Sequence, residues 1–401
     1  MKNVTYRVIG GTRRTDYVIL TVSIFFILLG LFAAYQMEHH GHVITGMSNQ
    51  IVWGMPHIFA IFMILAASGV LNVASISSVF RRTFYHPHAR LSVLLAITLL
   101  IGGLSVLVLD LGRPDRLVVA MTSYNLKSIF AWNMFLYNGF ILVCVIYLWF
   151  MMERRMQRYY PAVGFVAFIW RLVLTTGTGS IFGFLVAREA YNTAIMAPLF
   201  IALSLSLGLA VFLLVLIMQF RSLGEGVLHR PKILLGMFVG TVFCFVLVYH
   251  LTHLYFTGRH GVEYFILGGG GGIYTVLFWG GYIFLGTILP LLLLYHERFS
   301  RNRASVVVAS MLTIVGGFAL LYVIIIGGQA YPLDIFPGME VTSSGFFDEV
   351  ARHTYTPSRW EMMLGMSGIA ISALLTLLAL KILPFVPHSS ADFEVDPEFL
   401  E

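Results

Sequence analysis

The chain has 401 residues, of which 58% are hydrophobic and only 11% carry a charge. Soluble proteins have about 25% charged residues, so this composition excludes a water-soluble globule and indicates an integral membrane protein. The net charge of +6 comes from short clusters of Lys and Arg between apolar runs, a pattern typical of membrane flanks and not of nucleic-acid binding.

Ten apolar stretches reach the roughly 20 residues that an α-helix needs to cross a bilayer. In chain order they cover roughly residues 17–36, 53–80, 89–110, 129–152, 161–187, 195–219, 233–256, 272–296, 304–326 and 361–383. Strict alternation of apolar and polar residues is absent, so the predicted class is all-α with ten transmembrane helices. The first stretch is long and lacks a small-residue cleavage site, which favours a span over a cleaved signal peptide.

The distribution of basic residues predicts the orientation. Among the residues that flank the spans, 17 Lys and Arg lie on the side of the two termini and 7 on the opposite side. The positive-inside rule therefore puts both termini in the cytoplasm, and the sequence predicts a multi-pass protein of a bacterial inner membrane. The long connection over residues 327–360 lies on the outer side, where it is expected to be a lid over a site or a platform for a partner protein.

Three landmarks recur at offsets of 142 to 147 residues. They are Met55-Pro56 with Ala197-Pro198, Gly112-Arg113 with Gly258-Arg259, and Phe130-Ala131-Trp132 with Leu277-Phe278-Trp279. They predict two tandem four-helix bundles of the same orientation, although Pro at helix starts and Trp at interfaces also recur by chance. The predicted divisions are 1–52 (N-terminus, first helix and outer loop), 53–187 (first bundle), 188–326 (second bundle), 327–360 (outer loop), 361–386 (last helix) and 387–401 (acidic tail).

The two copies differ in their polar residues. The first copy has His57 after its proline and Asp110 at the end of the third span, where the second copy has Leu199 and Phe256. Ionisable groups at membrane depth are costly and mark function, so a polar site is expected at the outer end of the first bundle. The alternatives are a helix-terminal histidine that is already hydrogen-bonded, and a structural ion-pair cluster between Asp110 and the arginines that follow it.

Redox centres held by the chain itself are limited by its composition. The only cysteines, Cys144 and Cys244, lie inside apolar runs, which excludes an iron–sulfur cluster or a cysteine-ligated zinc. A haem b anchor would need His57 to pair with His250 or His253. A secondary transporter is the remaining alternative, because a parallel repeat suits it, but its polar residues are expected near the bilayer midplane and not at the outer edge.

Five stretches of the chain resemble the NrfD/PsrC family of quinone-interacting membrane subunits, in the ten-span branch that includes HybB and DsrP. They are Pro56–Phe62 with Ala66–Ser75, Leu109–Arg116, Lys127–Asn133, Leu174–Phe184, and Gln329–Gly338. The resemblance implies a quinone site in the first bundle with His57 and Asp110 as its catalytic residues. It also suggests that Arg113, Trp132, Asn133 and Gln329 line that site.

The resemblance further implies the cofactor and the partners. The cofactor is a quinone, either menaquinone or ubiquinone, and no haem, iron–sulfur cluster or other metal is held by this chain. A periplasmic ferredoxin-like iron–sulfur subunit takes the electrons, within a complex that can include cytochrome c, haem b and catalytic subunits. The chain is then one subunit of a quinone-linked oxidoreductase and not catalytic alone. A sulfur-metabolism (Dsr-like) complex is preferred, and a HybB-like hydrogenase subunit is the alternative.

These roles predict a division of labour within the site. His57 is expected to be the principal hydrogen-bond and proton partner of the head group, with Asp110 tuning or relaying. Arg113 is expected to keep Asp110 ionised, since an adjacent cation lowers the pKa of a carboxylate.

Overall fold

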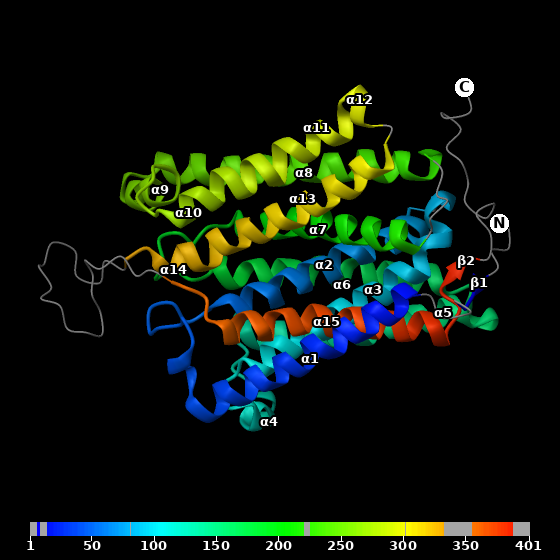
Figure 1. Cartoon of the computed structure of the whole chain (residues 1–401), viewed down its shortest axis with the longest axis horizontal. Helices are drawn as coiled ribbons and strands as arrows, with labels where there is room; N and C mark the ends of the chain where they lie inside the picture. Colours follow the sequence, from blue (N-terminus) through cyan, green and yellow to red (C-terminus); the bar gives the residue numbers. More distant parts are fainter. Residues whose placement is uncertain are drawn as a thin grey trace, which may run out of the picture.

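The computed structural model describes residues 6–8, 14–80, 82–219, 225–300, 302–332 and 355–387. The ten predicted spans are confirmed, because ten helices of this part of the chain are long and apolar enough to cross a membrane. They run side by side along the long axis of the molecule (Figure 1). Most of the predicted outer loop, with Asp334, and the acidic tail after Pro387 lie outside the described residues.

The spans are built from one or several helical segments each. The first five are α1 (Arg14–His40), α2 (Met55–Ser78), η2 with α3 (Thr83–His88 and Ala89–Leu109), α5 (Ile129–Met152) and α6 (Tyr160–Gly183). The last five are α7 (Met196–Gln219), α8 (Glu225–Tyr255), α10 with η6 and α11 (Ile273–Val276, Leu277–Ile288, Leu289–Tyr295), α13 with η7 and α14 (Arg303–Tyr322, Val323–Gly327, Gly328–Ala330) and α15 (Arg359–Ile382). Short connecting helices are η1 (His42–Ile44), η3 (Pro114–Arg116), α4 (Leu117–Thr122), η4 (Arg154–Met156), η5 (Thr257–Arg259), α9 (His260–Leu267) and α12 (Glu297–Ser300).

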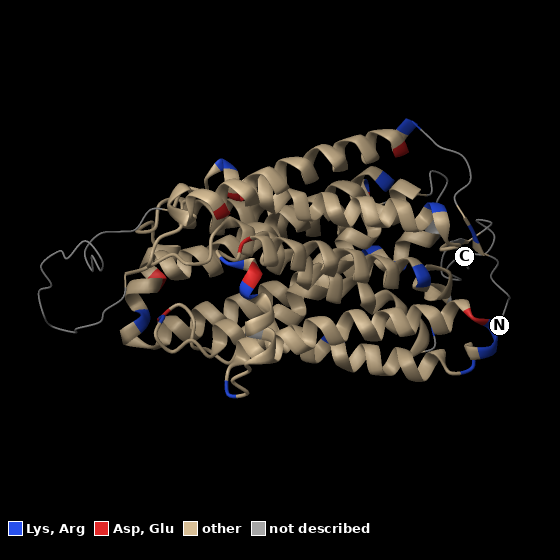
Figure 2. Cartoon of the chain, turned by 90° about the horizontal axis from the view of Figure 1, so that it is seen from below, with Lys and Arg blue, Asp and Glu red and all other residues tan. Residues whose placement is uncertain are grey.

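The two ends of the bundle differ in what they carry. Strand β1 (Tyr6–Arg7) pairs antiparallel with β2 (Val386–Pro387), so the first and last described segments meet at one end, called here the termini end. The opposite end, called here the site end, is where α2 and α7 begin and α3 and α8 finish. Figure 2 shows that most charged residues gather toward these two ends, as expected for helices that cross hydrocarbon.

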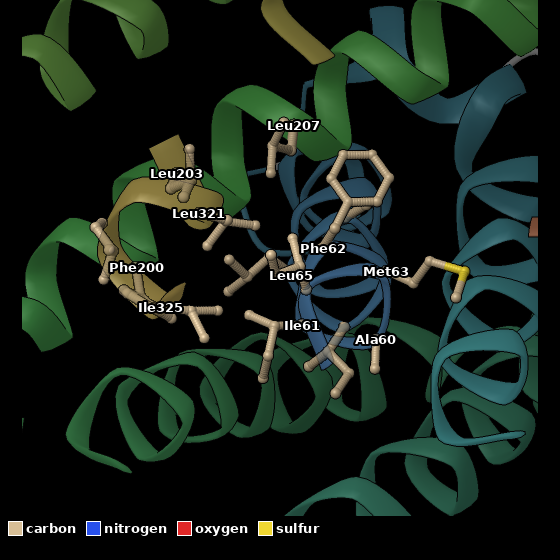
Figure 3. Packing of buried hydrophobic residues seen from close by; sticks show 14 of the residues in the cluster. Ala60, Ile61, Phe62, Met63, Leu65, Phe200, Leu203, Leu207, Leu321 and Ile325 are labelled. Carbon is tan, nitrogen blue, oxygen red and sulfur yellow. The ribbon is translucent and has the colours of Figure 1, made fainter. Parts of the chain in front are cut away.

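Helix α2 is the centre of the molecule. Its most apolar window is 94% buried, whereas that of α1 is only 22% buried, because α2 packs against α3, α6, α7 and α15. Figure 3 shows its side chains meeting those of α7 and of α13 with η7. The axes of α2 and α7 come closest at Gly69 and Gly208, where a Cβ on Gly69 would lie 1.6 Å from the carbonyl oxygen of Ser204. Only glycine permits this approach, as in other small-residue contacts between membrane helices.

The remaining helices pack around this pair. Helices α2, α3, α5 and α6 contact one another on one side, and α7, α8, η6 and α13 do so on the other. Helix α15 packs along α1 and also against α3 and α2, so the last span closes against the first group. The division into two repeated bundles remains a prediction. The contact of α15 with α2 and α3 matters for the site, because it brings a residue from the end of the chain beside its beginning.

Candidate functional site

The imidazole of His57 lies one turn into α2 at the site end. Helix α2 starts at Met55 with Pro56 in its first turn, where the missing N–H of proline costs nothing. The ring of His57 stacks on that of Trp53, with 5.4 Å between centroids and 12° between planes. His57 is only half-buried, and its side chain has no hydrogen-bond partner among the described residues. The alternative of an already hydrogen-bonded histidine is therefore not what the structure contains.

Aromatic rings surround the outer face of this stack. Trp53 contacts Phe182 of α6 edge-on, at 5.5 Å between centroids, and Phe130 of α5 at 6.1 Å. The space beside His57 is thus bordered by three aromatic side chains from different elements. A flat aromatic ligand would find both ring faces to stack on and one free imidazole to bond.

Asp110 caps the end of α3, close to the start of α2 in the antiparallel pair. A Cβ on Gly103 of α3 would lie 3.1 Å from the carbonyl oxygen of Ala60, which fixes the register of the two helices. From that level Asp110 is about two turns and His57 about one turn toward the site end. The Oδ1 atom of Asp110 is shut off from solvent and has no hydrogen-bond partner in the described part of the chain. Burial, and then the nearby carboxylate of Glu361, raise the pKa of Asp110 to about 8.

The expectation that Arg113 keeps Asp110 ionised is wrong. Arg113 is exposed, and no ion pair joins it to Asp110 among the described residues. After Asp110 the chain turns out through η3, with Arg113 in a non-helical conformation at its start. The raised pKa of Asp110 means that this carboxyl group keeps its proton at neutral pH, the opposite of the predicted state. The ion-pair cluster considered as an alternative is therefore also absent around Asp110 in the described structure.

Glu361 of α15 is a site residue that the sequence analysis missed. Its side chain is completely buried, and it accepts hydrogen bonds from the backbone N–H of Gly46 at 2.8 Å, from that of Ser358 at 2.8 Å and from the hydroxyl of Tyr355. Three donors around one carboxylate favour its ionised form. The signal in the sequence is the Ser358-x-x-Glu361 capping box that starts α15, which the structure forms in full. That motif predicts a helix start, but not that Glu361 is buried against the first group of helices.

Tyr355 joins Glu361 to the start of α2. Its buried hydroxyl donates to Glu361 and accepts the backbone N–H of Met55 at 2.7 Å. Burial, and then the charge of Glu361, raise the pKa of this hydroxyl well above its ordinary value, so it stays a donor. Gly54 makes room for the contact, since a Cβ there would lie 2.3 Å from Oε1 of Glu361. Residues some 300 positions apart thus fix the helix end that carries His57.

Gln329 has a different role from the predicted one. The side chain is buried, and its Oε1 accepts the N–H groups of Val52 at 2.9 Å and Trp53 at 3.1 Å. Its Nε2 donates to the carbonyl oxygens of Trp53 at 3.1 Å and Ile325 at 2.8 Å. The amide is therefore fully used by backbone groups and is not free for a ligand. Gln329 holds the segment that places Trp53 against His57.

Trp132 and Asn133 also fall outside the immediate surroundings of His57. The indole N–H of Trp132 donates to the carbonyl oxygen of Leu126 at 2.9 Å, and half of its side chain is exposed. Asn133 is buried and donates to Ile129 at 2.9 Å and Gly177 at 3.1 Å, which joins α5 to α6. From this stretch it is Phe130 that reaches the aromatic border of the site.

The two other histidines considered for haem ligation belong to a separate polar cluster. The Nε2 atom of His253 lies 2.8 Å from Arg259, and its Nδ1 lies 3.1 Å from Glu263. The Nδ1 atom of His250 lies 2.7 Å from the same carboxylate. His253 therefore has both ring nitrogens engaged, and only His250 keeps one free.

The fold and the site define the class of protein: a multi-pass membrane subunit with an aromatic, proton-exchanging site at one end of its helices. Comparison of the sequence with known families then identifies the family. Residues 43–332 match the family described as "Polysulphide reductase, NrfD", and the chain belongs to it. Helices α1 and α15 lie outside the matched region, so Glu361 comes from a helix that this match does not cover.

Three relatives show what the chain is similar to. It is 27% identical over 372 residues to the Hdr-like menaquinol oxidoreductase integral membrane subunit of Archaeoglobus fulgidus, covering 91% of this chain and 92% of the relative. It is 29% identical to a protein of Halobacterium salinarum named for the membrane subunit of dimethyl sulfoxide reductase, with 91% and 90% covered. It is 28% identical to Protein NrfD of Escherichia coli, with 70% and 96% covered. Relatives of this chain are thus membrane subunits of multi-subunit oxidoreductase complexes.

Proposed function

We propose that this chain is the subunit through which a quinone exchanges electrons and protons with an oxidoreductase complex, and that the head group binds beside His57 and Asp110. The observation that carries the proposal is the pair of titratable groups at the site end. The imidazole of His57 and Oδ1 of Asp110 have no partner among the described residues, although both lie at the ends of apolar helices. Unsatisfied groups in such surroundings are costly and are retained where a ligand satisfies them.

The residues fit a quinone head group in shape and in chemistry. Such a ring is flat and carries two oxygens, which require a hydrogen-bonding group each, while the isoprenoid tail requires an apolar cleft. Trp53, Phe130 and Phe182 offer aromatic faces, and the apolar helices around them suit the tail. His57 and Asp110 would face the two oxygens.

Oxidation of a quinol releases two electrons and two protons, and reduction of a quinone takes up the same. His57 is held by Trp53 with an imidazole that can accept a proton or donate one. Asp110 keeps its proton at neutral pH because burial and Glu361 raise its pKa to about 8, so it donates a hydrogen bond and exchanges its proton in mildly alkaline solution. Glu361 and Tyr355 set this protonation state, and Gln329 positions Trp53.

The electrons would pass to a partner. Two isolated cysteines inside apolar helices offer no cluster ligation, which supports a ferredoxin-like iron–sulfur subunit docked at the site end. The basic residues on the side of the termini support a cytoplasmic location for both termini and a periplasmic site end in an inner membrane.

The quinone and the complex are narrower parts of the proposal. The name of the Archaeoglobus fulgidus relative supports menaquinone over ubiquinone. We place the chain in a sulfur-metabolism (Dsr-like) complex, with cytochrome c, haem b and catalytic subunits as further partners. A HybB-like hydrogenase complex is the alternative.

The proposal is tested by purifying the complex from native membranes and measuring quinol turnover. We expect bound quinone in the extract, an iron–sulfur subunit in the complex, and turnover lost in His57→Ala with the same subunits still assembled. The matched control is His40→Ala, which changes an exposed histidine at the same end of the molecule and should keep full activity. Full activity of His57→Ala would refute the site, and the identity of the catalytic partner decides between the two complexes.

A further inference from the structure

A second set of buried ionisable side chains lies at the site end of α8, away from His57. His250 and His253 stand one turn apart on one face of α8, and η5 with α9 folds back so that Glu263 reaches both. Glu263 is 1% exposed, His253 is fully buried and His250 is 8% exposed. The proposed quinone chemistry uses none of these residues.

Counting hydrogens fixes the state of His253. Arg259 lies 2.8 Å from Nε2 of His253, and a guanidinium can only donate. The Nε2 atom must therefore carry a lone pair, which puts the ring proton on Nδ1, 3.1 Å from Oε1 of Glu263. His253 is thus neutral and has no remaining site for a second proton.

Glu263 is the ionised centre of the cluster. Burial alone would raise its pKa, but the hydrogen bonds from His250 and His253 outweigh burial and hold the pKa of this carboxyl below its usual range. The second oxygen accepts from Nδ1 of His250 at 2.7 Å. A carboxylate behind an imidazole orients the ring and stabilises its protonated form.

The remaining nitrogen, Nε2 of His250, has no partner among the described residues. His250 and Tyr249 are the polar members of the wall of a cavity with a volume of about 10 Å³, otherwise lined by apolar side chains such as Leu199 and Phe278. This is about the space that one water molecule needs, and far below that of an organic ligand. The hydroxyl of Tyr249 donates to the carbonyl oxygen of Ala190, so its own oxygen can accept from that water.

We propose that His250 is a proton-binding site of the second group of helices, where Nε2 takes up one proton through a single water molecule and Glu263 stabilises the imidazolium. No bond other than N–H forms, and the charge of the cluster rises by one. The charged and titratable groups around His250 are Glu263 of α9, Arg259 of η5, and Tyr249 and His253 of α8 itself. From α7, η6 and η7 the cavity wall receives apolar side chains. The inference does not depend on the quinone proposal.

The same cluster anchors the segment before α7. The second terminal nitrogen of Arg259 donates to the carbonyl oxygen of Asn192 at 2.9 Å, and Asn192 has a positive φ of 39°. Arg188 of that segment donates to the carbonyl oxygens of Gln329 and Gln50, next to Trp53. Variants of Arg259 would disturb this anchor, so the test is made on His250 and Glu263.

The experiment is infrared difference spectroscopy of the full-length protein in nanodiscs, with isotope-labelled histidine, between about pH 5 and pH 8, the range in which imidazoles change charge. Subtracting the spectrum of His250→Gln from that of the wild type should isolate one imidazolium band. In Glu263→Gln, which retains His250, the same band should appear only at lower pH. His260→Gln, an exposed histidine of α9, is the control and should leave the band in place.

Two outcomes would overturn the proposal. One is a spectrum of His250→Gln equal to that of the wild type. The other is a histidine titration in Glu263→Gln that is unchanged from the wild type, a result that remains informative if His250→Gln fails to fold. Neither measurement requires quinone or partner subunits, so failure here and failure of the proposed function are separate.

Discussion

Tyr355 and Met55 are 300 positions apart in the sequence, and the hydroxyl of the first accepts the backbone N–H of the second at 2.7 Å. The same hydroxyl donates to Glu361, so the first turn of α2 is fixed by the start of α15. His57 stands two residues after Met55. The position of the central histidine is thus decided by the last span of the chain, outside the region that defines the family.

Replacing Tyr355 by Phe tests this link. The change removes the hydroxyl between two buried groups, and leaving such groups unsatisfied costs about 1–3 kcal/mol of stability. We expect a lower midpoint of thermal unfolding in detergent, together with reduced quinol turnover. Tyr35→Phe, at an exposed tyrosine of α1, is the control and should match the wild type. Equal unfolding midpoints for the two variants would show that the hydroxyl of Tyr355 does not stabilise the fold.

Asp110 predicts a pH dependence of stability. Its pKa is about 8 in the folded protein against an ordinary 3.8, so the native state holds a proton that the unfolded chain has lost between these values. Stability from this group therefore falls as the pH rises from about 4 to about 8. Asp110→Asn should remove that part of the slope in unfolding midpoints measured at several pH values. A slope identical to that of the wild type would contradict the raised pKa.

Glu361→Gln tests the cause of that raised pKa. The carboxylate of Glu361 is the second cause after burial, so its neutralisation should move the ionisation of Asp110 to lower pH. In the proposed function, the alkaline limb of the pH profile of quinol turnover should shift in the same direction. The double variant with Asp110→Asn should lack this limb altogether. A limb that stays in place in the single variant would assign it to another group.

Gln329→Leu separates positioning from binding. The variant keeps a similar volume but leaves the N–H groups of Val52 and Trp53 without an acceptor, which should loosen Trp53 from His57. We expect a raised KM for quinol and an unchanged pH profile, because Asp110 is untouched. Gln50→Ala removes only a 3.4 Å bond to the carbonyl oxygen of Gln329 and serves as the control. A shifted pH profile in Gln329→Leu would mean that its amide acts on the titrating groups directly.

Two glycine substitutions probe the central helix pair. A Cβ on Gly69 would meet the backbone of α7 at 1.6 Å, so Gly69→Ala should separate α2 from α7 and abolish stable expression. Gly240 of α8 has nothing within 4 Å of its Cβ position, and Gly240→Ala should be neutral or stabilising by roughly 0.5–1 kcal/mol, since alanine favours helix. Size-exclusion profiles and unfolding midpoints distinguish the two. A monodisperse, stable Gly69→Ala protein would contradict the close packing at this crossing.

The sequence by itself determined the ten spans and singled out His57 and Asp110. Both follow from local physics, because a helix needs a certain apolar length to cross hydrocarbon and an ionisable group there is costly wherever it sits. The capping box at Ser358 likewise marks where α15 begins, whatever the helix packs against.

Only the tertiary structure decided how these residues are partnered. The exposure of Arg113, the full use of the Gln329 amide and the burial of Glu361 beside the start of α2 each depend on which helix ends meet. The state of His253 depends on Arg259 and Glu263, which η5 and α9 bring back over α8. Spans are set by the solvent that each segment meets, whereas hydrogen bonds and pKa values are set by contacts between segments up to 300 residues apart, which local composition does not encode.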